Sequence, residues 1–366
     1  MRFSINREKL LQPLSLAASV VERRQTMAVL SNLLVIVDGG KLSFTGSDLE
    51  VEIISHVSVD EFENGTTTVP ARKLLEVIKN LPDGALVHFE VKNNKAVVKS
   101  DKARFSLACL DSDSYPLLEP DSFHNSVDLP VSEFKTVLDK TAFSIALQDV
   151  RFFLNGLLFE FKESRLRCVA TDGHRLAAAD MESEISIEQE KSVIVPRKGV
   201  YEILRSIDGV SGTVQISLSP NHIQLRREGL ILTSKLIDGQ FPDYKSVIPA
   251  YPELEVLVNR SDMINVLRRA AILSNEKFRG VRVEIDQNLM TVSANNPERE
   301  EAKDELAVEY SGEKLVIGFN FTYLLEALSS LEGEIIKLAF RDAASSCLIT
   351  EIENDLIRHV VMPIKL

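Results

Sequence analysis

The sequence predicts an α+β protein built from three copies of one domain, each with two helices backing antiparallel sheets. A strand-like stretch recurs around Leu42, Leu166 and Leu289, at intervals of 124 and 123 residues. Helical and period-two apolar patterns alternate within each third of the chain. A repeat this long indicates three whole domains of one fold, because solenoid units are much shorter.

A second marker divides the chain at almost the same step. It reads Val-Pro-Ala-Arg72, Val-Pro-Arg197 and Gly-Phe-Asn320. Prolines cluster between the repeats and favour short, stiff linkers. We therefore expect three domains, which span residues 1–121, 122–249 and 250–366.

Two helices are expected in each third. Apolar residues at helical spacing predict helices over 4–24, 71–80, 132–140, 197–206, 261–282 and 320–331. Ser132 is the expected N-cap of the third helix, and Glu133 suits its first turn. The helix that opens each third is followed by strands, then by a second helix and more strands.

Strands are predicted by alternation. Apolar Val51, Ile53 and Val57 alternate with more polar neighbours, as in a strand with one buried face. The stretch 89–98 reads as a hairpin, since Asn93-Asn94 can adopt the positive φ angles of a tight turn. Each third therefore comprises two similar halves, and the chain comprises six.

The bulk composition is that of a soluble globular protein, with 45% hydrophobic and 26% charged residues. The three cysteines are far apart and lack metal spacing, which favours buried, reduced thiols. The N-terminus has no signal-peptide pattern, and no stretch approaches the length of a membrane span. A cytoplasmic location without membrane contact is expected.

The charge is unevenly distributed. The chain carries a net charge of −12, which argues against a nucleic-acid partner. The six predicted helices nevertheless sum to +8, so the remainder carries −20. Basic helix faces are common where helices are simply solvated. The alternative is that the helices share one face and that this face meets a polyanion.

An enzymatic function is not supported by the motifs. Asp172 and His174 resemble part of a catalytic pair, but no serine elbow or second histidine at ligand spacing completes it. Phosphate loops and dinucleotide fingerprints are also missing from the sequence. We expect no enzyme, no cofactor and no metal site. A scaffold that binds proteins but not DNA remains an alternative, favoured by the acidic balance and opposed by the basic helices.

Five separated motifs occur in an order that is similar to one known family. They are Thr171–Leu176, Val195–Gly199, Phe241–Tyr244, Asn275–Gly280 and Val360–Pro363. With the threefold repeat, they resemble the bacterial sliding clamps, the β subunits of DNA polymerase III. The resemblance implies three repeated DNA-clamp domains that form half of a pseudo-sixfold ring. It also implies a head-to-tail homodimer around duplex DNA, opened by an ATP-driven clamp loader, that tethers DNA polymerases and repair proteins.

Domain size supports two chains per ring. A domain of this length is roughly 35 Å wide. Three such domains closed on themselves leave a hole of only about 5 Å, whereas six leave roughly 35 Å, enough for a duplex about 20 Å wide. A single chain therefore cannot encircle DNA.

The predicted DNA contacts are independent of base sequence. Lysines and arginines on helices that face the opening would meet phosphates through water. The resemblance adds a loop with two phenylalanines, which read alternatively as core aromatics. The candidates are Arg24, Arg72, Lys73, Gln148, Phe152, Phe153, Arg197, Lys198, Arg205, Arg279 and Arg282.

The resemblance also implies a pocket for short peptide motifs of partner proteins, between the second and third domains. Apolar side chains would form the slot and polar ones would fix the peptide. Without the resemblance, Asp172-Gly173-His174 would read as an ordinary turn. The candidates are Leu154, Thr171, Gly173, His174, Arg175, Leu176, Pro242, Val247, Phe278, Asn320, Tyr323, Ser346, Val360, Met362 and Pro363.

Charge complementarity predicts the contact between two copies. Residues 92–107 are mostly basic and residues 298–305 mostly acidic, so the first domain would meet the third domain of a partner. Two separately solvated charge runs are the alternative. The candidates are Lys73, Arg104, Phe105, Leu107, Ile272, Leu273, Glu298, Glu300, Glu301 and Asp304.

Overall fold

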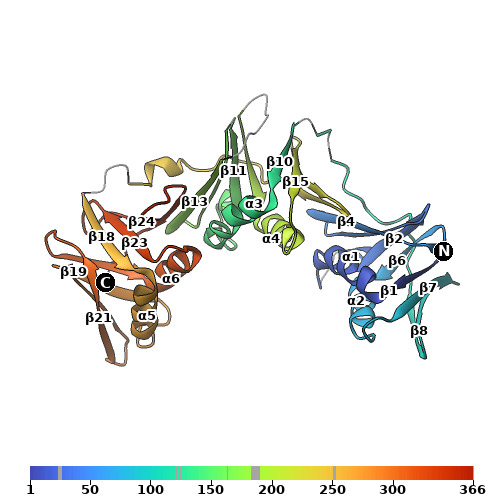
Figure 1. Cartoon of the computed structure of the whole chain (residues 1–366), viewed down its shortest axis with the longest axis horizontal. Helices are drawn as coiled ribbons and strands as arrows, with labels where there is room; N and C mark the ends of the chain where they lie inside the picture. The colour runs from blue at the N-terminus through green and yellow to red at the C-terminus, as the bar shows by residue number, and fades with distance from the viewer. Residues whose placement is uncertain are drawn as a thin grey trace. The chain divides into compact units, whose positions relative to one another are not determined.

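The computed structural model describes residues 1–23, 27–120, 122–123, 125–162, 164–182, 190–249 and 253–365. Within these ranges the chain forms six α-helices (Figure 1). They are α1 Arg7–Ser19, α2 Ala71–Lys79, α3 Val131–Asp139, α4 Arg197–Ile207, α5 Arg260–Ala271 and α6 Phe321–Ser330. All six predicted helices are therefore present.

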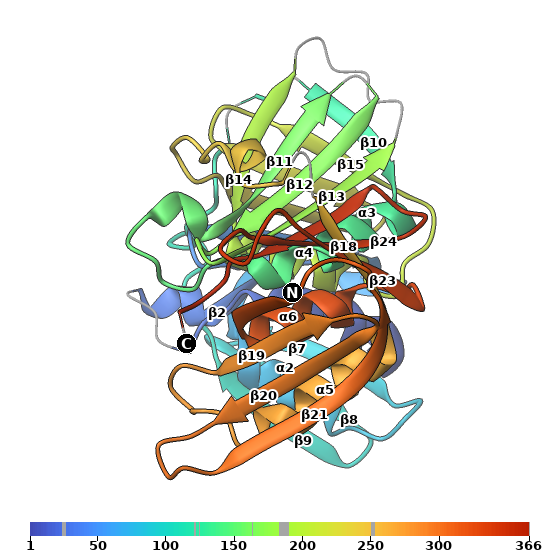
Figure 2. The same cartoon turned by 90° about the vertical axis from the view of Figure 1, so that its left-hand side faces the viewer.

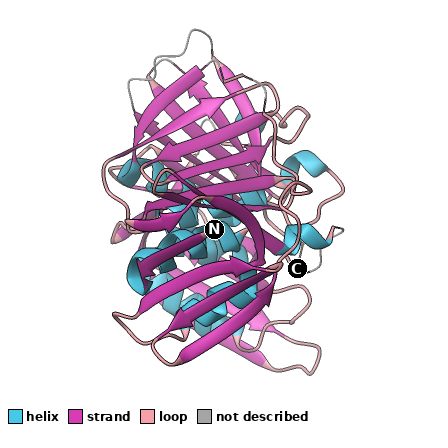
Figure 3. Cartoon of the chain, turned by 90° about the vertical axis from the view of Figure 1, so that its right-hand side faces the viewer, coloured by secondary structure: helices cyan, strands magenta, loops and turns pink. Residues whose placement is uncertain are grey.

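Strands make up most of the fold, and their order repeats. Each helix follows one strand and precedes three, so the unit is strand, helix and three strands, with β5 as an addition. Figure 3 shows the strands in magenta and the helices in cyan. The strands are β1 Arg2–Asn6, β2 Asn32–Asp38, β3 Lys41–Ser47, β4 Val51–Ser58, β5 Glu61–Glu63, β6 Gly65–Pro70, β7 Leu86–Lys92, β8 Lys95–Ser100, β9 Ala103–Ala108, β10 Asn125–Pro130, β11 Gly156–Lys162, β12 Arg165–Thr171, β13 Arg175–Glu182, β14 Lys191–Pro196, β15 Thr213–Leu218, β16 His222–Arg227, β17 Leu230–Lys235, β18 Leu254–Asn259, β19 Gly280–Asp286, β20 Leu289–Asn295, β21 Glu301–Glu309, β22 Leu315–Asn320, β23 Ile335–Phe340, β24 Cys347–Glu351 and β25 Ile357–Val361.

The predicted six half-units are confirmed, with one correction. A strand, not a helix, opens each third: β1, β10 and β18 precede α1, α3 and α5. The markers Leu42, Leu166 and Leu289 lie on β3, β12 and β20, the second strand after a helix in each repeat. The hairpin at Asn93-Asn94 is present between β7 and β8, and both asparagines have positive φ.

Two predicted helices are too long. Residues 4–6 belong to β1, which pairs with β7, and the Asn6 side chain then caps α1 by accepting from the Glu8 N–H at 3.0 Å. α5 ends at Ala271, and β19 begins at Gly280. The start of α1 differs because β1 has only 5 residues, too few to shift the helical pattern that follows it.

Two finer predictions are also wrong. α3 begins at Val131, so Ser132 lies in its first turn and is not the N-cap, whereas Glu133 is in the first turn as expected. The marker residues Arg72, Arg197 and Asn320 do not occupy equivalent positions in their helices, because each is shifted by one residue from the next. Arg72 is the second residue of α2, Arg197 is the first of α4, and Asn320 is the cap of α6.

The helices are less basic than predicted. With their observed bounds, the six described helices hold 12 lysines and arginines against seven acids, a net charge of +5. The difference of three arises because the observed bounds lower the net charges of α1, α3 and α5 by one each. The six helices together are therefore positively charged, whereas the whole chain carries a net charge of −12.

The described chain packs as two compact units. Unit 1 contains Met1–Ser132 and Lys198–Leu236, and unit 2 contains the described residues of 133–197 and 237–365. The middle repeat is divided because its strands continue the sheets of both neighbours. In unit 1, β17 pairs with β4, and in unit 2, β13 pairs with β25, both antiparallel.

Unit 1 holds two sheets, in the orders β5-β1-β7-β8-β9 and β10-β15-β16-β17-β4-β3-β2-β6. α1 and α2 pack together against them, and Leu10, Leu14 and Phe44 are buried in the shared core. The approach of α1 to β3 is close, because a Cβ atom on Gly46 would lie 1.9 Å from the Ala17 carbonyl oxygen. Only glycine fits there.

Unit 2 is organised by one long sheet, in the order β14-β11-β12-β13-β25-β24-β23-β18-β21-β20-β19-β22. Figure 2 shows β19, β20 and β21 side by side with α5 behind them. Asn259 and Asn320 cap α5 and α6 by accepting from the N–H groups of Asp262 and Thr322.

Candidate functional site

An apolar cluster on one face of the unit 2 sheet brings together several predicted pocket residues. Leu176 on β13 and Val360 on β25 face each other across the strand pair, and both are buried. Val247 packs against them from the segment that follows Phe241. Leu154 is also buried, beside the start of β11. Side chains from separate segments of unit 2 therefore meet at this face.

A rigid turn borders the cluster. Asp172 Oδ1 accepts the N–H groups of His174 and Arg175 at 2.9 and 3.0 Å. Thr171 Oγ1 donates to the Arg175 carbonyl at 2.6 Å and accepts the Gly173 N–H at 3.1 Å. Gly173 has φ +87°, a conformation that favours glycine. This is an Asx-type turn, and it presents His174 to solvent.

The C-terminal segment is tied to the same turn. The Met362 N–H donates to the His174 carbonyl oxygen at 2.9 Å, directly after the Arg175–Val361 pair. Met362 and Pro363 are half-buried, and Ser346 lies just before β24, the neighbour of β25. These predicted residues lie on the same side of unit 2 as the apolar cluster.

Arg175 differs from the prediction that it fixes a peptide. Its Nε donates to Asp172 at 3.1 Å, its Nη1 pairs with Glu326 on α6, and its Nη2 donates to the Phe143 carbonyl at 2.8 Å. Its guanidinium also lies over the rings of Phe143 and Tyr323, at 5.4 and 4.7 Å. Through these contacts, Arg175 on β13 is linked to Glu326 on α6 and to Phe143. Its side chain is largely buried.

The remaining polar candidates have mixed placements. His174 stacks on Tyr323 with 6.4 Å between ring centroids, so these two side chains lie together. The Asn320 side-chain oxygen accepts the Thr322 N–H and is thus used as a helix cap. Phe278 is 66% exposed, on a turn held by the Asn275 side chain. Pro242 is exposed beside the cluster.

Sequence reasoning missed Arg151. Its guanidinium covers Gly173, since a Cβ there would lie 2.8 Å from Arg151 Nη2. Asp149 holds Arg151 by a bidentate pair at 3.0 and 2.9 Å, which together with a backbone N–H bond lowers the Asp149 pKa to about 2. Arg151 lies 22 positions from Gly173 in the chain, so no spacing or periodicity signals this contact.

The predicted DNA-contact loop is exposed and ordered. Leu147, Val150 and Phe152 are 75%, 96% and 59% exposed. The loop is closed at its base, because the Asp149 N–H donates to Asn155 Oδ1 and Asn155 Nδ2 donates to the Asp149 carbonyl, both at 2.8 Å. Gln148 is exposed on this loop and has φ +56°.

Phe153 has a different position from Phe152. It is half-buried and packs against the apolar cluster. Phe152 and Phe153 meet edge to face at 5.9 Å. Of the two aromatics predicted to meet DNA, the first is exposed and the second belongs to the cluster.

The basic DNA candidates also separate into groups. Arg72 and Lys73 are exposed on α2, and Arg205 is 56% exposed on α4 beside Glu202. Lys198 is largely neutralised, because its Nζ pairs with Glu22 at 2.6 Å and with Asp48. Arg197 donates to the Ile145 carbonyl at 2.9 Å.

Two further basic candidates do not lie on helices, which corrects the prediction. Arg279 lies in the turn before β19, and Arg282 lies on β19 itself, where it pairs with Glu284 at 2.8 Å. Both side chains are exposed. Arg24 falls outside the described residues.

Most of the predicted contact residues between copies are exposed, and the exceptions are Leu107, Leu273 and Asp304. Ile272 is 77% exposed, and Arg104 and Phe105 are exposed on β9. Glu298, Glu300 and Glu301 are exposed as well, whereas Asp304 pairs with Arg269 at 2.5 Å. Leu107 belongs to the core of unit 1, so its place in such a contact was predicted wrongly.

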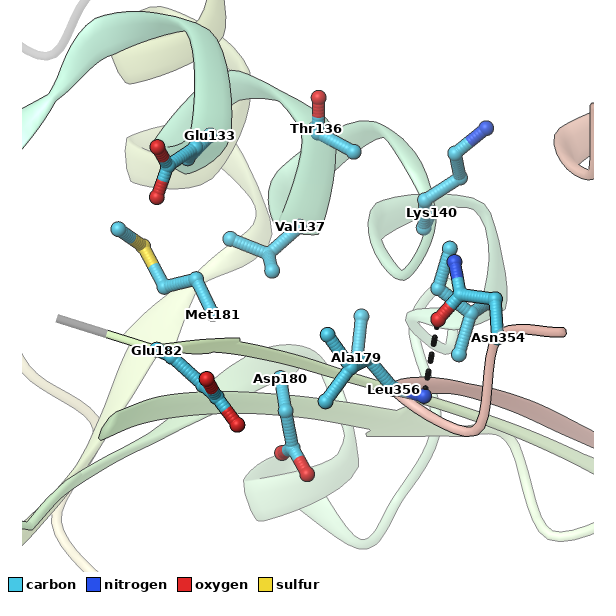
Figure 4. Close-up of a pocket in the computed structure, with 11 residues that line it drawn as sticks. Glu133, Thr136, Val137, Lys140, Ala179, Asp180, Met181, Glu182, Asn354 and Leu356 are labelled. Atoms are coloured by element: carbon cyan, nitrogen blue, oxygen red, sulfur yellow. Dashed lines mark hydrogen bonds between the residues drawn. The ribbon is translucent and has the colours of Figure 1, made fainter. Parts of the chain in front are cut away.

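Unit 2 also contains a cavity of about 300 Å³, apart from the apolar cluster. It lies between α3, β13 and the turn at Asn354. Met181 points toward Val137 on α3, whereas Asp180 points the other way (Figure 4). None of the predicted pocket residues lines this cavity. It opens on the helix side of β13, opposite to the face that carries Leu176.

The described residues lack two features, a group of metal ligands and a membrane-spanning helix. None of their His, Cys, Asp and Glu side chains gather in threes where a metal ion could be held. No described helix has the length and apolar character that crossing a membrane requires.

The geometry agrees with the comparisons to known proteins. Models of the N-terminal, central and C-terminal domains of the DNA polymerase III β subunit match residues 1–119, 128–243 and 245–365. The chain belongs to this family, the β sliding clamps. The sliding clamps of Pseudomonas putida and Escherichia coli K12 are 44% and 42% identical to it over 367 residues, with complete coverage of both chains.

Solved structures extend the family match to the fold. The Pseudomonas aeruginosa sliding clamp bound to griselimycin superposes with a TM-score of 0.97 and 44% identity, and each chain is fully covered. Three repeated clamp domains are thereby confirmed. The protein is a DNA sliding clamp, a processivity subunit that works with DNA polymerase without being an enzyme itself. The non-DNA scaffold alternative is not favoured.

Proposed function

We propose that two copies of this clamp pair head to tail into a closed ring around duplex DNA, which tethers polymerases and repair proteins through a peptide site in unit 2. We define the peptide site as Leu176, Pro242, Val247, Val360 and Met362, bordered by the turn 171–175. The proposed domains span 1–121, 122–249 and 250–366. The ring would be opened by an ATP-driven clamp loader in the cytoplasm.

The observation that carries the tethering function is the convergence at the peptide site. Segments around residues 176, 247 and 360 contribute to one apolar cluster, with Met362 fixed to the turn. Apolar side chains beside an exposed histidine and a tyrosine suit a short peptide with apolar anchors and a hydrogen-bonding backbone. The flexible Met362 side chain suits varied partners.

Sheet edges support the pairing of copies. β9 is the last strand in its sheet, and it carries exposed Arg104 and Phe105. β21 pairs with β18 at only two positions, so Glu301–Ala307 has β20 as its sole neighbour among the described strands. An unpaired edge is a template for another chain. We infer that basic β9 of one copy adds to acidic β21 of the other, with Ile272 covering the contact.

We propose that five of the residues predicted from the sequence contact the DNA. Arg72, Lys73 and Arg205 lie exposed on helices and would meet phosphates, while Gln148 and Phe152 would approach from the ordered loop. Lys198 contributes less, because two carboxylates already neutralise its charge. Such contacts read no base sequence and allow sliding.

Retention on DNA of different topology tests the ring. The clamp is loaded on nicked circular DNA, the circle is linearised, and bound protein is measured by gel filtration. Encirclement predicts that the protein remains on circles and is lost from linear molecules. Equal retention on both forms would contradict the ring and indicate ordinary adhesion.

Griselimycin offers a separate test of the peptide site, because the sliding clamp of Pseudomonas aeruginosa binds this compound. Calorimetric titration should give saturable binding with one site per chain. Met362→Ala should weaken it by roughly tenfold, corresponding to about 1.4 kcal/mol of lost apolar contact. Lys365→Ala, a neighbouring exposed position, is the matched control and should bind like the unchanged protein.

A further inference from the structure

A row of polar side chains crosses the sheet beside the peptide site. Glu160 on β11, Arg167 on β12 and Asp180 on β13 are direct neighbours in the strand register. They share the sheet face with the adjacent row, Leu158, Val169 and Ala178, which belongs to the apolar cluster. A sheet face that is apolar in one row and charged in the next is unusual for a core.

The row is buried and paired. Arg167 and Asp180 are each 8% exposed, and two hydrogen bonds of 2.5 and 2.6 Å join the guanidinium to the carboxylate. A bidentate pair of this kind fixes the plane of the guanidinium. One further donor of Arg167, Nη1, then points at the Tyr244 hydroxyl oxygen at 3.3 Å.

Tyr244 joins this row to the peptide site. Its hydroxyl accepts from Arg167 and donates to the Glu160 carboxylate, while its ring packs in the apolar cluster and is 4% exposed. Burial raises the pKa of Tyr244 to about 12, so the hydroxyl keeps its proton and remains a donor. Pro242 lies two residues before Tyr244, and Val247 lies three residues after it.

Among the described residues, the hydrogen bonds of the segment 241–248 besides this anchor are local. Ser246 Oγ donates to the Asp243 carbonyl at 2.8 Å, and the Val247 N–H donates to the Tyr244 carbonyl at 3.1 Å. These bonds shape a single turn but do not tie it to the sheet. Phe241, Val247 and Ile248 pack against the apolar cluster, and the Tyr244 side chain adds the polar attachment of the turn to the sheet.

We infer that Glu160, Arg167 and Asp180 form a polar anchor that positions Tyr244, and that the anchor thereby sets the places of Pro242 and Val247 in the peptide site. These are positioning residues, because none of them needs to touch the bound peptide. The inference rests on the proposed peptide site. It adds the contacts that hold Pro242 and Val247 in place. A hydroxyl held from two sides defines depth and rotation of the ring, which apolar packing alone leaves adjustable.

The test removes one atom. Tyr244→Phe keeps the ring and deletes the hydroxyl, and Tyr310→Phe is the matched control, since Tyr310 is equally buried in unit 2 and donates to the Glu313 carbonyl at 2.6 Å. Griselimycin binding should weaken three- to tenfold in Tyr244→Phe and stay unchanged in Tyr310→Phe. Glu160→Gln keeps an acceptor for the hydroxyl and should retain most of the affinity.

Hydrogen exchange of the full-length protein provides a second readout that needs no ligand. Amides of 241–248 should exchange several times faster in Tyr244→Phe, while those of β13 and β25 should not change. If both exchange and affinity match the unchanged protein, the anchor is refuted. If the unchanged protein does not bind griselimycin, the proposed peptide site fails, but exchange still decides whether Tyr244 is anchored.

Discussion

Met362 donates its backbone N–H to the carbonyl oxygen of His174, at 2.9 Å. This single bond joins the chain's last residues to a turn almost two hundred positions earlier. It continues the ladder between β13 and β25, where Leu176 faces Val360. The exposed turn and the C-terminal segment are therefore one surface.

Removal of residues 362–366 should abolish griselimycin binding and leave the pairing of copies intact. The deletion removes Met362 of the peptide site and its neighbour Pro363, but none of the residues proposed for the contact between copies. Calorimetry measures the first effect, and light scattering coupled to gel filtration measures the second. Unchanged affinity of the shortened chain would remove the assignment.

The deletion needs a control, because the Ile364 N–H also donates to the carbonyl of Gly318 on β22, at 2.8 Å. The deletion therefore loosens a second contact. Met362→Ala retains the backbone bonds and isolates the side chain. Both variants should lose binding if the site lies where we propose.

The sequence could predict repeats, element types and the gathering of apolar pocket residues, because each depends on local pattern or on motif order. Leu176 and Val360 are named through the resemblance, and both are buried and face each other. The sequence could not show that Arg175 and Lys198 are occupied by internal carboxylates. Glu326 and Asp48 lie 151 and 150 positions away from them, and only the packing of strands brings such pairs together.

Lys140 should be important for the stability of unit 2. Its side chain is 8% exposed, and its Nζ donates to the Ser330 carbonyl at the end of α6 and to Glu332 at 2.6 Å. Lys140→Met should lower the free energy of unfolding by about 1–3 kcal/mol, because a buried acceptor loses its partner. Glu332→Gln should cost less than about 1 kcal/mol, since Glu332 is 83% exposed. Urea unfolding measures both, and equal losses would contradict the assignment.

His359 predicts a dependence of stability on pH. Burial, with some repulsion from Lys140, lowers its pKa from 6.5 to about 3, so the folded protein holds it neutral. Between these values the unfolded chain binds a proton that the folded chain excludes. Stability should therefore fall as pH decreases from about 6.5 toward 3, by up to about 1.4 kcal/mol per pH unit.

His359→Gln separates this effect from the carboxylates that also titrate in acid. The glutamine can still bond to Ser330, the partner of His359 Nε2 at 2.9 Å. Denaturation curves at pH 7.5 and 5 should show a smaller loss for the variant than for the unchanged protein. Parallel losses would mean that His359 does not exclude its proton.

Replacing two apolar residues after α5 should convert the paired protein into single chains. Ile272 is 77% exposed and follows directly on the helix, and Leu273 beside it is half-buried. An exposed isoleucine at the rim of an acidic strand edge is what a subunit contact would cover. Ile272→Ala with Leu273→Ala removes this apolar area, so sedimentation at low micromolar concentration should show single chains. Ile352→Ala, exposed to 50% on another surface, should not change the mass. A stable pair in the double variant would refute the proposed contact and leave the charged edges of β9 and β21 without a role in pairing.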